Sequence, residues 1–212
     1  MNCDYSQEYI CLLLEQQLNQ FLITTTELQI IKKHLAAVWE RTSFCFKHST
    51  NKYYARDGEV FFNPFHSGQW CVFLYYLSNT IYREEAVPTN LPDKIYMLNK
   101  SLNSCDLFYE VNLPDIFFLD HPLGTVIGRA TIKNFFTFAQ GCTVGNNKGV
   151  FPNIDEHVTM MSDSKVIGNC NIGKNVIIAA NTYIKDENVP VGSIVFGSSP
   201  NIIIKAQKQL LL

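Results

Sequence analysis

The chain has 212 residues, of which 47% are hydrophobic and 17% charged, and its formal net charge is −2. These values are typical of a soluble globular protein of one domain or two small ones, and they provide no basic surface for nucleic acid or an anionic membrane. Seven cysteines, an odd number without paired CxxC spacing, favour reduced, packed thiols over disulfides or a zinc site.

The N-terminal segment carries Asp4 and Glu8 and no basic residues, so it is unlike a secretory signal. The apolar runs at 12–14 and 72–77 are too short to cross a bilayer. We therefore expect no membrane span and a cytoplasmic location.

The first hundred residues predict helices. Residues 6–21 form an amphipathic pattern, and Thr24 followed by Glu27 is a capping box that begins a second helix. Residues 53–62, which include Arg56-Asp57-Gly58, predict a turn or short hairpin.

A third helix is expected to begin at Asn63 and Pro64, a good N-cap and first-turn pair, and to run to about Tyr82. It is apolar on most sides and should be buried. A short fourth helix from Pro92 to about Ser101 completes the N-terminal helical domain, which we place at residues 1–104.

Beyond this domain, an apolar residue recurs at nearly every sixth position. The positions are Leu107, Leu113, Leu119, Val126, Ile132, Phe138, Val144, Ile154, Met160, Val166, Ile172, Ile178 and Ile184. A helix repeats at about 3.6 residues and a strand at 2, so a period of six indicates short strands joined by tight turns in a solenoid. With three sides per turn, the segment would form about five coils.

Two steps in this repeat are irregular. The step from Leu119 to Val126 is seven residues and the step from Val144 to Ile154 is ten. Asp120 and His121 lie in the first of them. A longer step there would move the His121 side chain out of register and towards a groove.

The segment containing Leu119, Asp120, His121, Gly124 and Gly128 resembles the serine acetyltransferase branch of the hexapeptide-repeat acyltransferases. The resemblance covers nearly all of residues 105–205 and continues through Gln140, Thr143, Gly145, Pro152, Val158, Lys165, Gly168, Asn169, Gly173, Ala180, Val189, Pro190 and Gly197. It implies an α+β fold, with an N-terminal helical domain followed by a C-terminal left-handed parallel β-helix at residues 105–212 that ends in a short tail.

The resemblance also implies acetyl transfer from acetyl-CoA to a hydroxyl group. Such a reaction needs a base to remove the hydroxyl proton, and a neutral imidazole is suited to this step. We expect His121 to be the general base and Asp106, fifteen residues upstream, to orient its ring. Asp106 could instead cap the fourth helix. Asp120 corresponds to a family residue that contacts the acceptor.

The cofactor positions are inferred in the same way. Gly145, Ser162 and Ala180 would line the path of the pantetheine arm, and Lys205 is a candidate for the phosphates of coenzyme A. No metal is expected, because the coil supplies only His121 and His157 where a metal hydratase on this fold would need three histidines.

The chain departs from the serine-specific members at the acceptor. They carry an Arg-His pair that helps to hold the serine carboxylate, whereas this chain has Val150 and Phe151. A buried carboxylate without a partner is costly, so L-serine is disfavoured and the Phe151 rim suits a sugar ring. The favoured function is O-acetylation of a small molecule or sugar, in capsule or surface-polysaccharide synthesis.

Two alternatives stay open: a serine O-acetyltransferase of cysteine biosynthesis, and a non-catalytic trimeric scaffold or regulatory subunit. The resemblance implies a homotrimer, and trimers could pair through the N-terminal helices. The segment Asn63–Gln69 could reach over an acceptor or simply begin a helix. His34, His48, His66 and His157 are interpreted as solvated surface residues.

Overall fold

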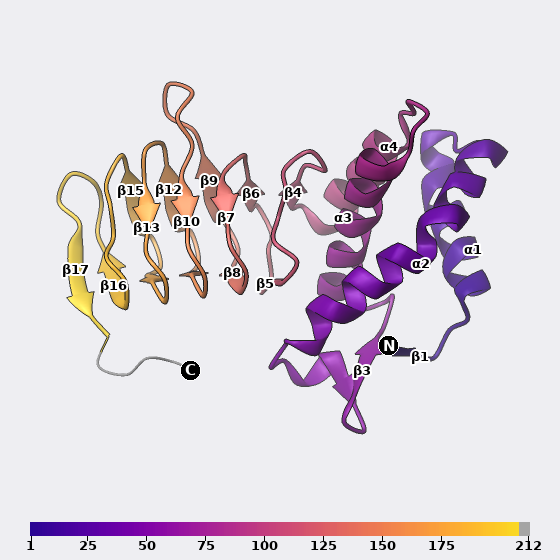
Figure 1. Cartoon of the computed structure of the whole chain (residues 1–212), viewed down its shortest axis with the longest axis horizontal. Helices are drawn as coiled ribbons and strands as arrows, with labels where there is room; N and C mark the ends of the chain where they lie inside the picture. Colours follow the sequence, from indigo (N-terminus) through magenta and orange to yellow (C-terminus); the bar gives the residue numbers. More distant parts are fainter. Residues whose placement is uncertain (208–212) are drawn as a thin grey trace. The chain divides into compact units, whose positions relative to one another are not determined.

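The computed structural model describes residues 1–207, and the chain divides into two compact units, Met1–Asn103 and Ser104–Leu212 (Figure 1). The end of the predicted C-terminal tail, residues 208–212, lies outside the described residues. None of the helices formed by residues 1–207 has the length and apolar character needed to cross a membrane.

The first unit contains four α-helices and a small sheet of order β1-β3-β2. Its elements are β1 (Asn2–Cys3), α1 (Gln7–Leu18), η1 (Asn19–Phe21), α2 (Thr25–Lys47), η2 (Lys52–Tyr54), β2 (Ala55–Arg56), β3 (Glu59–Phe62), α3 (Ser67–Glu84) and α4 (Leu91–Asn103). The predicted hairpin is confirmed, because β2 and β3 pair antiparallel around Asp57 and Gly58. Helix α3 is buried along most of its length, as its apolar sequence predicts.

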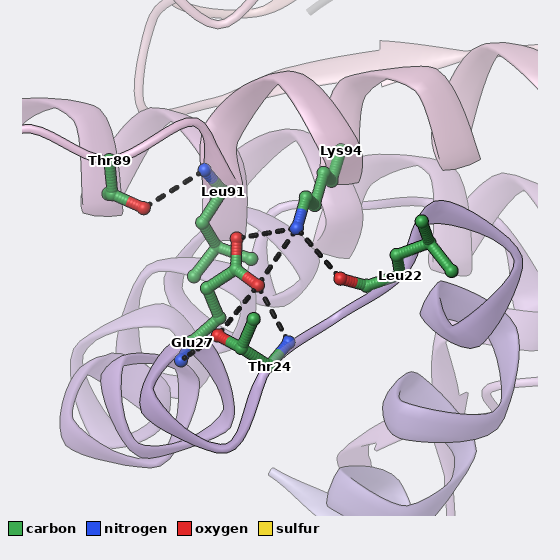
Figure 2. Close-up of polar contacts among 6 residues, drawn as sticks. All are labelled: Leu22, Thr24, Glu27, Thr89, Leu91 and Lys94. Atoms are coloured by element: carbon green, nitrogen blue, oxygen red, sulfur yellow. Dashed lines mark hydrogen bonds and ion pairs between the residues drawn. The ribbon is translucent and has the colours of Figure 1, made fainter.

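The predicted capping box at the start of α2 is present and is extended by a lysine. Glu27 accepts hydrogen bonds from the Thr24 backbone N–H (2.7 Å) and hydroxyl (3.0 Å), and Lys94 of α4 lies 2.8 Å away (Figure 2). Lys94 also donates to the Leu22 carbonyl (3.1 Å). Burial opposes ionisation of Glu27, but hydrogen bonds from Lys94 and Thr24 outweigh it, so the pKa of Glu27 is lowered.

The start of α3 differs from the prediction. The helix begins at Ser67 with His66 as N-cap, whose Nδ1 accepts from the Gln69 N–H (3.3 Å). Asn63 and Pro64 instead form a turn that precedes the helix. His66, predicted to be a solvated surface residue, is half-buried and has a structural role as this N-cap.

His34 was also misplaced by the sequence analysis. His34 is only 5% exposed, and its Nε2 lies 3.2 Å from Oε2 of Glu85, the C-cap residue of α3. Lys33 donates to the same carboxylate (2.9 Å). The hydrogen bond from Lys33, followed by that from His34, lowers the pKa of Glu85 to about 2.

The second unit is a parallel β-helix of about five coils whose strands form three faces. One face has the order β17-β16-β14-β11-β8-β5, the second β15-β12-β9-β6-β4 and the third β13-β10-β7. The strands are β4 (Asp106–Leu107), β5 (Phe117–Leu119), β6 (Val126–Ile127), β7 (Thr131–Ile132), β8 (Phe136–Phe138), β9 (Thr143–Gly145), β10 (Asn153–Ile154), β11 (Thr159–Met160), β12 (Lys165–Ile167), β13 (Asn171–Ile172), β14 (Ile177–Ile178), β15 (Tyr183–Lys185), β16 (Ser193–Phe196) and β17 (Ile203–Ala206).

Most of the predicted six-residue positions point into the core, which confirms the solenoid. Leu119 is only half-buried. Val126 does not point inward: it is 41% exposed, and Ile127 is buried in its place. The strand register explains this, because Ile127 pairs with the buried Val144. The cysteines at 142 and 170 are buried in the coil as predicted.

Candidate active site

The turn that carries His121 is longer than the other turns at the same corner of the coil. Strand pairing aligns Leu119 with Phe138 and Val126 with Thr143. Six residues, 120–125, therefore span a corner that four residues, 139–142, span on the next coil. The turns 161–164 and 179–182 also have four residues, so this one coil contains a two-residue insertion. The sequence analysis placed an irregularity here but underestimated it by one residue.

This longer turn is fixed by hydrogen bonds to the coils on both sides. The Asp120 N–H donates to the Phe138 carbonyl (3.0 Å), and the Gly124 N–H donates to the Ser104 carbonyl (2.8 Å). His121 occupies the left-handed region (φ 47°), which reverses the chain between these two anchors. The turn is thus an exposed feature whose backbone position is well determined.

The imidazole of His121 projects from this turn. Its side chain is 86% exposed in the isolated chain, and its Nε2 lies 3.6 Å from Asp120 Oδ1. That separation is too long for a hydrogen bond. The ring can therefore reach an incoming hydroxyl group, and residues 1–207 leave most of it open to solvent.

Asp106 lies on the coil below, in β4. It pairs with Val126, and its N–H donates to the Thr125 carbonyl (2.8 Å). The carboxylate therefore belongs to the strand beside the one that the His121 turn enters. The orienting role of Asp106 stays a prediction.

Two of the predicted cofactor residues share the corner of His121. The Gly141 N–H donates to Leu123, and the Asn181 N–H donates to Ser162. Residues Leu123, Gln140, Ser162 and Ala180 thus occupy equivalent positions on successive coils. The sequence analysis missed the exposed Leu123 and Met161, which add apolar surface to this corner. Apolar residues in turns are the signal that could have identified them.

Gly145 and Phe151 lie at the next corner of the coil. Gly145 ends β9, and about 10 Å of strand separates it from the corner of His121. The ten-residue step from Val144 to Ile154 contains a small hairpin, in which Asn147 and Val150 exchange backbone hydrogen bonds of 3.0 Å. Phe151 follows this hairpin and is 40% exposed.

Lys205 lies apart from these corners, on the antiparallel strand β17 opposite Ile194. Its Nζ is 5.7 Å from the centre of the Phe196 ring. A groove of about 540 Å³ crosses the sheet β13-β10-β7. None of the predicted site residues within residues 1–207 lines this groove. The groove is therefore separate from the predicted catalytic residues.

Comparison with known proteins shows which proteins this chain resembles. No family model matches the chain. Serine acetyltransferases from Staphylococcus aureus (strain Mu50) and Staphylococcus epidermidis are each 37% identical to it over 91 residues, which make up 41% of this chain and 42% of theirs. The matched segment thus spans less than half the length of these curated relatives.

Solved structures extend the likeness in fold to most of the chain. Serine acetyltransferase from Neisseria gonorrhoeae superposes with a TM-score of 0.70 at 18% identity, covering 91% of this chain and 78% of that one. The enzyme from Brucella abortus gives 0.65 at 18% identity, covering 87% and 75%. The fold is thus shared with solved serine acetyltransferases, and the predicted resemblance to serine acetyltransferases is confirmed.

Proposed function

We propose that this chain is an acetyl-CoA-dependent O-acetyltransferase in which His121 is the general base. The observation that carries this proposal is the two-residue insertion, which places the His121 imidazole outside an otherwise regular corner of the coil. Backbone hydrogen bonds to the coils on both sides hold this turn in place. One of the structural neighbours, a serine acetyltransferase from Brucella abortus, was solved in complex with coenzyme A.

The reaction requires one proton to move twice. His121 takes the proton of the acceptor hydroxyl while its oxygen attacks the thioester carbonyl. The C–S bond then breaks, and the imidazolium returns the proton to the departing thiolate, so the products are an acetyl ester and free coenzyme A. Asp106 would stabilise the imidazolium and fix the ring tautomer.

The corner of His121 has the chemistry that a pantetheine arm needs. Ser162 and Ala180 have small side chains, and Leu123 and Met161 add apolar surface beside them. Gly145 at the next corner and Lys205 on β17 would contact other parts of acetyl-CoA.

A homotrimer would supply the missing wall of the site. The outward side chains Phe118, Thr137, Thr159 and Ile177 align on successive coils of the sheet that leads to the corner of His121. Packing this ladder of two apolar and two threonine side chains against a second copy would cover it and place a neighbouring surface beside His121. Pairing of two trimers would instead involve the helices of the first unit.

We propose a sugar hydroxyl as the acceptor, in capsule or surface-polysaccharide synthesis in the cytoplasm. Val150 and Phe151 are exposed at the hairpin, and neither can pair with a carboxylate. Asp120, beside His121, could accept a hydrogen bond from another hydroxyl of the same sugar.

The test is thiol release from acetyl-CoA with a panel of acceptors: L-serine, N-acetylglucosamine, methyl galactoside and maltose. Turnover of a sugar with little turnover of L-serine supports the proposal. Robust turnover of L-serine alone would favour serine O-acetyltransferase, and no turnover with any acceptor would favour a non-catalytic scaffold.

A further inference from the structure

Three aromatic side chains from two distant segments meet on the surface of the first unit. The rings of Tyr5 and Tyr9 stack with centroids 4.7 Å apart, and Phe65 meets Tyr5 edge-on at 5.4 Å. Phe65 is 59% exposed and Tyr9 is 39% exposed. We refer to Tyr5, Tyr9 and Phe65 as the aromatic platform.

The turn that presents Phe65 is rigidly defined. The Asn63 side-chain oxygen accepts from the Phe65 N–H (3.0 Å), and the Asn63 carbonyl accepts from the His66 N–H (3.0 Å). Pro64, between them, restricts the backbone further. Phe65 is therefore held out from the unit by a turn with little conformational freedom.

The side chain of Gln69, which is fully buried, holds this turn in place by hydrogen bonds. Its Oε1 accepts from the Asn63 N–H (2.7 Å), and its Nε2 donates to the Tyr53 carbonyl (2.8 Å). The polar residues of the Asn63–Gln69 segment are thus explained by the turn and the helix start. The edge contact with Tyr5 accounts for part of the Phe65 ring, but the residue is 59% exposed, and this exposed part contributes little to folding.

The size of the platform limits what it can bind. With about 200 Å² per aromatic side chain, Phe65 and Tyr9 together expose roughly 200 Å², whereas a stable protein interface needs about 800 Å² on each partner. An area of this size matches one or two sugar rings. The C–H groups on one face of a pyranose carry partial positive charge, which is attracted to the negative face of an aromatic ring.

Hydrogen-bonding groups lie next to the platform in the chain. Asp4 precedes Tyr5 and forms an exposed ion pair with Arg56 (2.7 Å). A carboxylate and a guanidinium side by side can both bind sugar hydroxyls, and their opposite charges favour a neutral ligand over an anionic one.

We propose that the aromatic platform binds a neutral sugar residue of a polymeric acceptor, so that the first unit of this chain is a glycan-binding module. This inference rests on the proposed function, because it takes over the sugar acceptor proposed there. It adds that the acceptor is a polysaccharide or oligosaccharide chain, held at a point other than the hydroxyl that is acetylated.

The experiment measures binding of maltoheptaose, cellohexaose and chitohexaose to the full-length protein by saturation-transfer NMR, without acetyl-CoA. We expect Phe65→Ala to weaken binding of at least one of them by roughly threefold to tenfold, the effect of losing one stacked ring. Phe44→Ala is the matched control, because Phe44 is 51% exposed but lies outside the platform. It should bind like the wild-type protein.

Two further variants separate stacking from simple apolar contact. Phe65→Leu keeps apolar volume without an aromatic face and should bind as weakly as Phe65→Ala, whereas Phe65→Trp should bind at least as well as wild type. Wild-type binding by Phe65→Leu would overturn the proposal, as would the absence of binding by all three oligosaccharides. Self-association in sedimentation velocity that Phe65→Ala abolishes would instead assign the platform to a second copy of the chain.

The outcome is independent of catalysis. His121→Ala should bind the oligosaccharides normally, because the platform lies wholly in the first unit. Absence of acetyl transfer by the wild-type protein, with oligosaccharide binding present, would therefore count against the proposed function and not against the platform.

Discussion

The two units of this chain reveal function in different ways. In the β-helix, the same turns recur on most coils, so a departure such as the two extra residues before β6 is visible at once. The helical unit has no such repeat, and its unusual features must be judged by whether packing and hydrogen bonding account for them.

By that criterion most polar residues of the helical unit are structural. Glu27, His34, His66 and Gln69 each make hydrogen bonds or ion pairs that hold helices or turns together. In the β-helix, by contrast, His121 is exposed on an anchored turn and serves no evident structural purpose. A polar residue without a structural task is the better candidate for chemistry.

The largest expected effect tests this contrast at His121. Replacing His121 by Ala should lower the rate of acetyl transfer by roughly 10² to 10⁴, because the hydroxyl would lose its base. Thiol release from acetyl-CoA measures it. His157→Ala is the control, since His157 is also exposed but lies at another corner; equal losses in the two variants would contradict the assignment.

The second effect should appear in the helical unit. Lys94→Met leaves the Glu27 carboxylate buried without its cation and should destabilise the unit by about 3 kcal/mol. Thermal unfolding followed by circular dichroism at 222 nm reports on the helices. Lys33→Met breaks the more exposed pair with Glu85 and should have a much smaller effect. Similar losses in both variants would show that burial of the ion pair is unimportant.

The sequence predicted the regular parts of both units well, because they depend on local patterns. The six-residue period identified the coil, and Thr24 with Glu27 identified the start of α2. Lys94 could not be predicted as the partner of Glu27, because that contact joins residues 67 positions apart. Asn63 was a reasonable N-cap, but a hydrogen bond from its own N–H to the side chain of Gln69, six residues along the chain, placed it in the preceding turn instead.

The candidate site was predicted less completely. The resemblance supplied residue identities, but only strand register shows that Ile127, and not Val126, points inward. It also shows that Ser162 shares the corner of His121 while Gly145 lies at the next one. A count along the chain does not reveal these positions when turns differ in length.

The third prediction concerns the hairpin that precedes Phe151. Asp186 accepts hydrogen bonds from the Asn147 side chain (2.6 Å) and the Asn169 N–H (2.8 Å), and the bond from Asn169 is the main reason that its pKa is lowered. Asp186→Ala should release the hairpin and increase tryptic cleavage after Lys148, at its tip. Glu156→Ala, which removes an ion pair with Lys174 at another corner, should leave cleavage after Lys148 unchanged; a rise in both variants would indicate general loosening of the coil.

The smallest expected effect is the pH dependence of the Glu27 cluster. Because the folded-state pKa of Glu27 lies below the ordinary value of 4.5, its ionised form stabilises the unit above that pH, and this contribution falls as the pH drops through the folded-state pKa. The difference in thermal midpoint between wild type and Glu27→Gln should therefore be constant from pH 7 to about 5 and shrink towards pH 3. In a Lys94→Met background the shrinkage should be weaker, because the lysine that lowers the pKa of Glu27 is gone. A difference that grows as the pH falls would mean that Glu27 stabilises the unit mainly in its protonated form, contrary to the ion pair in the structure.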